Sequence, residues 1–243
     1  MPDREIRTVL LVDSSASILF YLAMLLRRLE YKVMTARSAE EALRIMEAET
    51  PSLVLTELYL PQMSGMLFLK TIKDSARFKA IPVVVLTAEK DPKMKDGCAS
   101  LGSSAFLSKP VEPDVLYRTL QSVTESTPRA NIRLNTSLKV IVGDSNAIGV
   151  AVRTECAIAI SEGGVYIKTL YPQPRNALIH LRIFIHDWQI DAKAVVLYSF
   201  GLGEGSFQEP GMGMKFSEIS DRDRALIRSF IKQQLTGDLG TPV

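Results

Sequence analysis

Three charged side chains in the first half of the chain stand at the ends of apolar runs. Asp13, Glu57 and Lys109 each close a short run that is typical of a buried strand. Ligands in open α/β sheets bind outside the carboxyl ends of the strands, so we expect all three side chains to face one crevice. Carboxylates there could anchor Mg²⁺ beside a phosphate, and the crevice could position a phosphoryl group for transfer.

The segments around these residues alternate between strand-like and helix-like patterns. Right-handed crossovers then place helices on both faces of a parallel sheet, and the expected strand order is the flavodoxin-like 2-1-3-4-5. The fold predicted for this half is therefore an α/β doubly wound parallel sheet. Strands are predicted near 8–12, 32–36, 52–57, 82–87 and 104–108, and helices over 16–30, 38–49, 64–74, 91–101 and 112–124.

This half of the chain resembles the receiver domain of bacterial two-component response regulators. The matching residues are Leu11-Val12-Asp13, Glu57 four places before Pro61, Gly65, Thr87-Ala88, and Phe106 with Lys109-Pro110. The resemblance implies a receiver pocket in which Thr87 and Phe106 are the switch residues. Their ordinary interpretation is a strand-end hydroxyl and a packed aromatic ring. The implied pocket consists of Asp13, Ser14, Glu57, Thr87, Phe106 and Lys109.

Two positions depart from the receiver pattern. Ser14 stands where the family has a second acid, which weakens the oxygen cage for Mg²⁺, so we expect weak or absent magnesium binding. Glu57 replaces the phosphate-accepting aspartate, and its extra methylene displaces the attacking oxygen from the in-line position. We therefore expect a pseudo-receiver that is not phosphorylated by the usual route. Glu57 either mimics the phosphorylated state or pairs with Lys109 and keeps the pocket closed.

The character of the sequence changes after residue 125, where a polar stretch ends in Pro128. Strand patterns dominate from there, and one helix closes the chain, which predicts a small antiparallel β-barrel with a C-terminal helix. We divide the chain into a receiver-like domain (1–125), a linker (126–136) and a barrel domain (137–243). Strands are predicted over 138–142, 150–160, 165–168, 178–185, 189–198 and 212–216, and the helix over 221–235.

The second half resembles the PilZ domain, a bacterial receptor for cyclic di-GMP, over roughly residues 128–236. The resemblance is carried by Arg129-Ala130-Asn131-Ile132-Arg133, by 161–167 and by 210–216. It implies ligand binding by Arg129, Arg133, Ser161 and Gly164. An arginine fork suits both phosphate oxygens and the guanine edge.

Ala159 departs from the PilZ pattern because the family has Asp or Asn there. One lost contact to a buried polar group costs about 1–3 kcal/mol, or about 5- to 150-fold in affinity. The alternative interpretation of Arg129 and Arg133 is a pair of solvated linker charges that contact Glu155 or Glu162.

Composition limits the remaining function classes. The formal net charge of +2 implies no strongly basic surface, although it allows a local basic patch, so nucleic acid is not an expected main partner. Cys98 and Cys156 suit reduced thiols, and the apolar runs are too short for membrane insertion, so we expect a cytoplasmic protein. No catalytic residues and no metal site are predicted.

These observations predict a non-enzymatic signalling adaptor. It would bind cyclic di-GMP through the PilZ domain and relay that state to a protein partner that the sequence does not identify. The alternative is a protein-interaction module that has lost both inputs. Leu116, Leu120 and Val123 have the spacing of a helix face that could form a homodimer or dock on the barrel.

Overall fold

The computed structural model describes residues 7–143, 152–204 and 210–237. The described chain forms two compact units, residues 7–130 and Asn131–Gln234, and each is described by itself.

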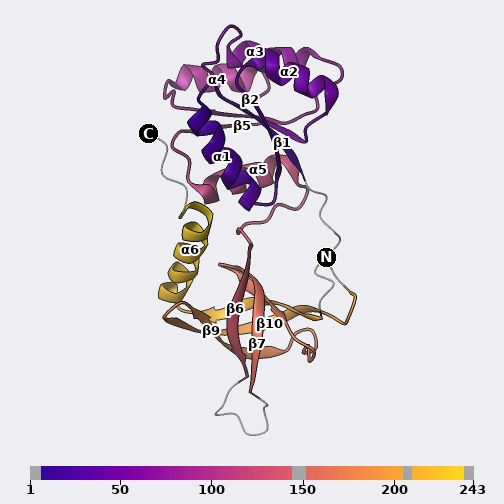
Figure 1. Cartoon of the computed structure of the whole chain (residues 1–243), viewed down its shortest axis with the longest axis vertical. Helices are drawn as coiled ribbons and strands as arrows, with labels where there is room; N and C mark the ends of the chain where they lie inside the picture. Colours follow the sequence, from indigo (N-terminus) through magenta and orange to yellow (C-terminus); the bar gives the residue numbers. More distant parts are fainter. Residues whose placement is uncertain (1–6, 144–151, 205–209, 238–243) are drawn as a thin grey trace. The chain divides into compact units, whose positions relative to one another are not determined.

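The first unit is a five-stranded parallel sheet between two layers of helices. Its strand order is β2-β1-β3-β4-β5, which confirms the predicted order. Helices α2, α3 and α4 cover one face of the sheet, and α1 and α5 cover the other (Figure 1). The elements are β1 (Thr8–Val12), α1 (Ala16–Arg28), β2 (Lys32–Ala36), α2 (Ala39–Ala48), β3 (Leu53–Thr56), α3 (Gly65–Asp74), β4 (Val83–Thr87), α4 (Pro92–Ser100), β5 (Ala105–Ser108) and α5 (Pro113–Thr124).

Continuous apolar runs form the central strands because both faces of this sheet are covered. Every residue of β3 and β4 is buried. Serines begin the helices that follow β2 and β3: Ser38 Oγ accepts from Glu41 N at 3.2 Å, and Ser64 Oγ accepts from Leu67 N at 3.3 Å. These caps fix where each helix leaves the carboxyl edge of the sheet, and so they fix the loops around the predicted crevice.

Two of the three residues on the predicted face of α5, Leu116 and Leu120, are fully buried, and the third, Val123, is half-buried. A homodimer through this helix stays a prediction. The spacing of four residues between Leu116 and Leu120 is also the spacing of a helix stripe that faces a core, and burial of that stripe is what stabilises an amphipathic helix in a folded domain.

The second unit is a closed antiparallel barrel of six strands with one helix. The strand order around the barrel is β10-β11-β8-β7-β6-β9, and the barrel with its C-terminal helix confirms the predicted fold. The elements are β6 (Leu134–Val142), β7 (Arg153–Ser161), β8 (Gly164–Lys168), β9 (Leu178–Ile185), β10 (Trp188–Phe200), β11 (Gly211–Ile219) and α6 (Asp221–Thr236).

Two barrel strands, β6 and β7, begin more than one residue away from their predicted starts. β6 starts at Leu134, four residues before the predicted start, because Leu134 and Asn135 pair with the end of β7 ahead of a bulge. β7 is described from Arg153, and the predicted start at residues 150 and 151 lies outside the described residues. The early start of β6 matters for the site, because it joins the arginine-bearing segment, residues 129–133, directly to the barrel.

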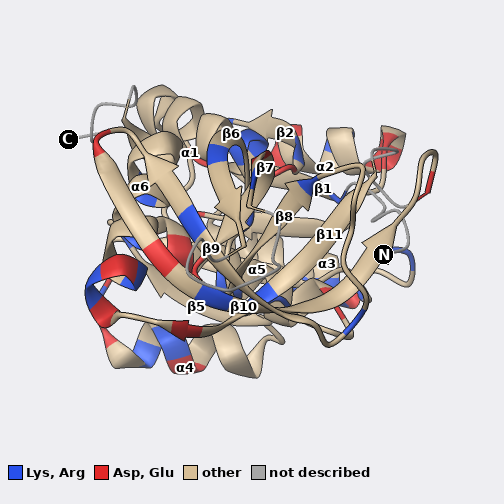
Figure 2. Ribbon diagram, turned by 90° about the horizontal axis from the view of Figure 1, so that it is seen from below, with Lys and Arg blue, Asp and Glu red and all other residues tan. Residues whose placement is uncertain are grey.

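Helix α6 packs on the barrel through an apolar stripe. Ile227, Phe230 and Ile231 are buried, and the Phe230 ring meets the His186 ring edge-on with centroids 5.8 Å apart. Within the described residues, no helix is both long enough and apolar enough to cross a membrane. Acidic and basic residues alternate over the ribbon, in keeping with the small net charge (Figure 2).

Candidate functional sites

The arginine-bearing segment lies beside the turn that joins β7 to β8. Asn131 Nδ2 is 2.9 Å from the position that a Cβ on Gly163 would occupy, and Leu134 pairs with Ile160 in the β6–β7 register. Arg133 lies in the chain between these two contacts. The barrel therefore brings Arg133 alongside the predicted Ser161–Gly164 turn.

Within that turn, Ser161 and Gly164 have distinct structural roles. Ser161 is buried, and its hydroxyl donates to the Gly164 carbonyl at 3.2 Å. A Cβ on Gly164 would lie 2.1 Å from the Met214 carbonyl oxygen, so no side chain fits where β8 pairs with β11. Close packing of the strands is thus sufficient to require glycine at 164, whereas Ser161 keeps lone pairs that can accept hydrogen bonds.

Ala159 occupies the position where the PilZ pattern has an amide or a carboxylate. It is buried and pairs with Asn135 on β6 and with Tyr166 on β8. A methyl group offers no hydrogen bond, so this position cannot contact a guanine edge.

The turn is also tied to α6 by a residue whose role the sequence did not assign. Glu162 Oε2 accepts from Arg228 Nε at 3.0 Å and from Nη2 at 2.7 Å. The Glu162 carbonyl accepts from Arg224 Nη1 at 2.6 Å. The only signal in the sequence was that Arg224 and Arg228 are one helical turn apart, which does not identify their partner. Glu155, the other acid considered, accepts from Thr169 Oγ1 at 2.7 Å.

The two predicted arginines fall on either side of the junction between the units. Arg129 belongs to the first unit, where its backbone N–H donates to Gln121 Oε1 at 3.3 Å, and Arg133 belongs to the second. The RxxxR pattern therefore spans the junction.

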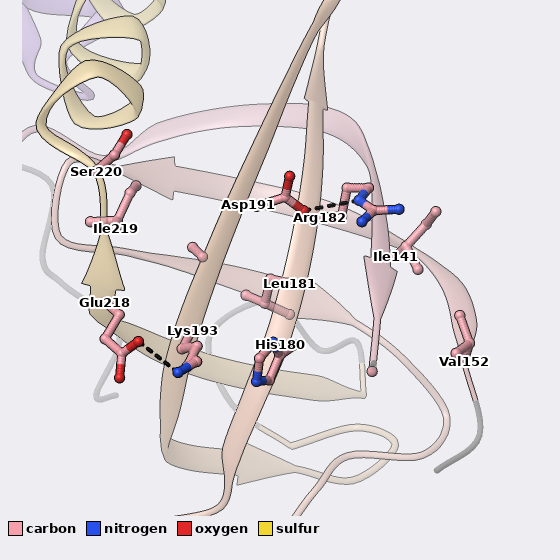
Figure 3. Close-up of a pocket in the computed structure, with 12 residues that line it drawn as sticks. Ile141, Val152, His180, Leu181, Arg182, Asp191, Lys193, Glu218, Ile219 and Ser220 are labelled. Atoms are coloured by element: carbon pink, nitrogen blue, oxygen red, sulfur yellow. Dashed lines mark hydrogen bonds and ion pairs between the residues drawn. The ribbon is translucent and has the colours of Figure 1, made fainter. Parts of the chain in front are cut away.

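A separate depression of about 710 Å³ lies on the barrel (Figure 3). Arg182 Nε contacts Asp191 Oδ1 at 2.9 Å, and Lys193 Nζ contacts Glu218 Oε2 at 2.7 Å, so its charges pair with one another. Hydrogen bonds from Gln189 and Arg182 lower the pKa of Asp191 below its usual value, although desolvation opposes them. None of the predicted ligand residues lines this depression. Its lining is Ile141, Gly143, Val152, His180, Leu181, Arg182, Asp191, Ala192, Lys193, Glu218, Ile219 and Ser220.

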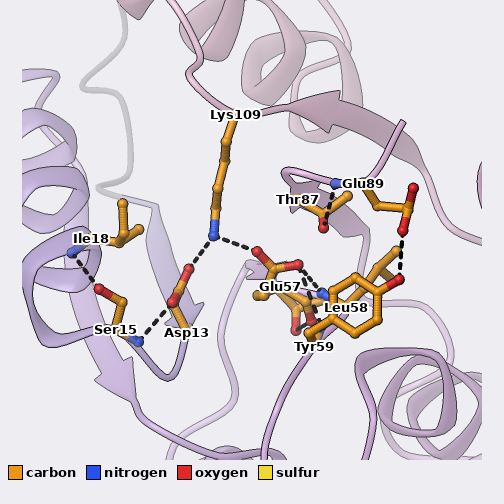
Figure 4. Close-up of polar contacts among 10 residues, drawn as sticks. Asp13, Ser15, Ile18, Glu57, Leu58, Tyr59, Thr87, Glu89 and Lys109 are labelled. Atoms are coloured by element: carbon orange, nitrogen blue, oxygen red, sulfur yellow. Dashed lines mark hydrogen bonds and ion pairs between the residues drawn. The ribbon is translucent and has the colours of Figure 1, made fainter. Parts of the chain in front are cut away.

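In the first unit, the predicted crevice residues meet at the carboxyl ends of β1, β3 and β5. Lys109 Nζ lies 2.5 Å from Asp13 Oδ2 and 2.5 Å from Glu57 Oε2 (Figure 4). The side chains of Asp13 and Glu57 are 5% and 9% exposed, and that of Lys109 is 17% exposed. One ammonium group thus forms ion pairs with two nearly buried carboxylates. Its attraction offsets part of the free-energy cost of removing those carboxylates from water.

The remaining carboxylate oxygens are also occupied. Asp13 Oδ1 accepts from Ser15 N at 2.9 Å. Glu57 Oε1 accepts from Leu58 N at 2.6 Å and from Tyr59 N at 3.4 Å. The longer glutamate side chain therefore turns back onto its own loop, and each of the four oxygens has a donor. This arrangement favours the interpretation of Glu57 as the ion-pair partner of Lys109.

The other predicted pocket residues do not join this cluster of charges. Ser14 is exposed, and its carbonyl accepts from Arg37 Nη2 at 3.4 Å. Thr87 is fully buried, and its hydroxyl accepts from Glu89 N at 3.2 Å. Phe106 is half-buried and packs against the core between the sheet and α2–α4.

A second contact bridges the loops after β3 and β4. The Tyr59 hydroxyl donates to Glu89 Oε2 at 2.5 Å. This bond lowers the pKa of Glu89 from its ordinary value, and the backbone N–H groups of Asp91 and Lys90 lower it further. The same bond is the main reason that the pKa of Tyr59 is raised. Neither residue was singled out in the sequence, because each is an ordinary surface residue until the loops approach.

The receiver resemblance implies magnesium, so the oxygen donors of the pocket need to be compared with what that ion requires. Among the residues that the structure describes, no group of three His, Cys, Asp or Glu side chains could hold a metal ion. Mg²⁺ demands octahedral oxygen ligation. Asp13 and Glu57 both face Lys109, and Ser14 brings no carboxylate, so the donors present do not fit the ion.

Comparison with known proteins agrees with this architecture. The family model described as the response regulator receiver domain matches residues 9–121, and the model described as the PilZ domain matches residues 125–233.

Individual relatives resemble part of the chain. The two-component response regulator ORR7 of Oryza sativa subsp. japonica is 38% identical over 111 residues, which are 45% of this chain and 53% of that protein. ORR11 of Oryza sativa subsp. indica is 34% identical over 116 residues, or 47% of this chain and 79% of that protein. This chain thus spans about half the length of ORR7.

Solved structures give a similar partial match. The chemotaxis protein CheY4 of Vibrio cholerae is 31% identical, covers 49% of this chain and 99% of its own, and aligns with a TM-score of 0.47. The two family matches adjoin with a gap of a few residues, and they take in both units of the structure. The chain therefore carries a response regulator receiver domain followed by a PilZ domain.

Proposed function

We propose that this protein is a signalling adaptor that binds cyclic di-GMP through its PilZ domain and relays the bound state to a protein partner. PilZ domains are a receptor family for cyclic di-GMP, and receiver domains are signalling modules rather than catalysts. The receiver domain here takes part without being phosphorylated.

The observation that carries the proposal is the position of the arginine-bearing segment on the barrel. Contacts at Asn131 and Leu134 hold that segment against the turn that contains Ser161. A guanidinium and a hydroxyl side by side suit a ligand with phosphate oxygens and a guanine edge, because arginine donates two bonds in a plane and serine can donate or accept.

A calorimetric titration of the full chain with cyclic di-GMP tests the proposal. The wild-type chain should bind, and Arg133→Ala should abolish or severely weaken binding. Arg175→Ala is the matched control, because it removes the same charge from an exposed position in the loop after β8. Absence of binding by the wild-type chain would refute the proposal, and so would equal losses in the two variants, which would indicate only a general effect of charge.

For the receiver domain we propose a closed pocket that neither loads magnesium nor accepts phosphate. Support comes from Lys109, whose ammonium group already pairs with both Asp13 and Glu57. A phosphoryl donor would have to displace that ion pair, and no second acid at position 14 would hold the metal that assists the transfer.

The position of the two arginines also suggests how binding is relayed. A ligand held by Arg129 and Arg133 would join the last residues of one unit to the first residues of the other. Binding would then narrow the range of orientations of the two domains. Small-angle scattering of the chain with and without cyclic di-GMP should give different profiles. An unchanged profile at saturating ligand would exclude this mode of relay while leaving the binding proposal intact.

The second candidate function is a protein-interaction module that has lost both inputs. The specific observations in its favour are the methyl group of Ala159 on β7, two residues before Ser161, and the closed ion pair of the receiver pocket. The same titration separates the two candidates, since this one requires that cyclic di-GMP does not bind.

A further inference from the structure

We propose that Asn135 provides the guanine-recognising group that Ala159 lacks. The inference rests on the proposed binding of cyclic di-GMP, and it assigns a specificity-determining role to a residue outside the RxxxR and Ser-Gly motifs.

The strand register carries the inference. Asn135 on β6 is the direct antiparallel partner of Ala159 on β7. Side chains of direct partners leave the same face of a sheet, with Cβ atoms about 4.5–5.5 Å apart. Asn135 is exposed, whereas its neighbour Leu134 pairs with the fully buried Ile160 on the opposite face. Asn135 therefore extends from the outer face of the barrel, next to the position where the PilZ pattern has its amide or carboxylate.

The same face carries the ligand turn. Ala159 and Ser161 are two residues apart on β7, so their side chains lie on one side of the strand. Arg133 precedes Asn135 by two residues in the segment that runs alongside. Ala159 contributes only a methyl group to this face, whereas its partner Asn135 on β6 contributes a carboxamide. A polar group is thus retained at this point of the surface, but it is attached to the neighbouring strand.

Guanine requires such a group because arginine cannot recognise its whole edge. The base presents the acceptors O6 and N7, and also the N1–H and 2-amino donors. Arginine has only donors, so it can serve the acceptors but not the N1–H and 2-amino groups. A carboxamide oxygen accepts from both of these donors, and Asn135 supplies one.

The other acceptors near the turn are less well placed for this task. Glu162 Oε2 is held by the two donors of Arg228. Ser161 directs its hydroxyl at the Gly164 carbonyl, and its short side chain offers a single oxygen. Ala159 offers none. Asn135 supplies a carboxamide oxygen on this face, opposite Ala159 in the strand register.

Titration of Asn135→Ala with two ligands tests the assignment. The ligands are cyclic di-GMP and cyclic di-IMP, which lacks the 2-amino group. The variant should bind cyclic di-GMP about 5- to 150-fold more weakly than the wild-type chain, the range for one lost hydrogen bond to a buried polar group. Cyclic di-IMP keeps the N1–H donor but lacks the 2-amino donor, so the variant should lose less affinity for it than for cyclic di-GMP. The ratio of the two affinities that the wild-type chain shows should therefore decrease. Thermal unfolding of the variant should match that of the wild-type chain, because Asn135 is exposed.

Thr136→Val is the matched control, since it removes a hydroxyl from the next residue of β6 and should leave both affinities unchanged. Equal affinity of Asn135→Ala and the wild-type chain for cyclic di-GMP would overturn the assignment alone. Equal losses for both ligands would also overturn it, because they would show that Asn135 only supports the fold of the site. Failure of the wild-type chain to bind either ligand would refute the proposed function and this inference together.

Discussion

Glu162 and Arg228 join the proposed ligand turn to the C-terminal helix of the barrel. One oxygen of the Glu162 carboxylate accepts from two nitrogens of the Arg228 guanidinium, at 3.0 and 2.7 Å. Arg224 adds a bond to the carbonyl of the same glutamate. The turn is thus held from behind by α6, so a change in either element should be transmitted to the other.

Arg228→Ala should therefore weaken ligand binding more than it weakens the fold. Arg228 is 62% exposed, and exposed ion pairs contribute only about 0–1 kcal/mol to stability. Without this bond Glu162 can move, and its neighbour Ser161 is then held less firmly in the ligand turn. The affinity for cyclic di-GMP should therefore fall. Calorimetry and thermal unfolding measure the two effects. The control is Arg222→Ala, on the same helix but beside Trp188, which should keep wild-type affinity. Equal affinities of the Arg228 variant and the wild-type chain would mean that α6 does not position the turn.

Lys109→Met should be strongly destabilising. The substitution keeps an unbranched side chain, one atom shorter, but leaves the carboxylates of Asp13 and Glu57 nearly buried without their shared cation. Removing one partner of a buried ion pair typically costs about 3–5 kcal/mol, and urea denaturation would measure the loss. Lys32→Met, which breaks the exposed pair with Glu49, is the comparison and should cost about 0–1 kcal/mol. Similar losses in the two variants would contradict the structural role assigned to Lys109.

Two substitutions should restore phosphate acceptance to the receiver domain. Ser14→Asp together with Glu57→Asp recreates two acids at the end of β1 and shortens the side chain that turns back onto its loop. We expect magnesium-dependent labelling of this double variant by acetyl phosphate, and no labelling of the wild-type chain. Ser14→Asp with Glu57→Asn is the control, because it adds the acid but removes the acceptor. Stable labelling of wild-type Glu57 would contradict the proposed closed pocket.

The contact between Tyr59 and Glu89 should be visible in the pH dependence of the receiver domain. The hydrogen bond from Tyr59 lowers the pKa of Glu89, so its contribution to stability is present above the usual glutamate pKa. That contribution is lost as the pH falls through the lowered value in the folded protein. Tyr59→Phe should raise the pKa of Glu89 toward its ordinary value in a carboxyl NMR titration. An unchanged pKa would show that the backbone donors alone hold it down.

Local sequence patterns predicted the helices and strands well, because the spacing of apolar residues reflects which sides of an element are buried. The apolar runs at 53–56 and 83–87 are strands that are buried on both sides, and Ser38 caps the helix that follows it, as its spacing to Glu41 indicated. Asp13, Glu57 and Lys109 meet at one edge because parallel strands end at the same edge. The spacing of Leu116 and Leu120 did not reveal that both residues are buried, because a core stripe and an interface stripe have the same period.

The sequence by itself determined the order of strands and helices, the acids and lysine of the receiver pocket, and the departures at Ser14, Glu57 and Ala159. Only the tertiary structure decided which groups lie next to the residues at these three positions. The direction taken by the Glu57 side chain, the partner of Glu162 and the register that places Asn135 beside Ala159 all depend on contacts between segments distant in the chain. Such contacts follow from how the elements pack and pair in space, and residue spacing along the chain does not record that arrangement.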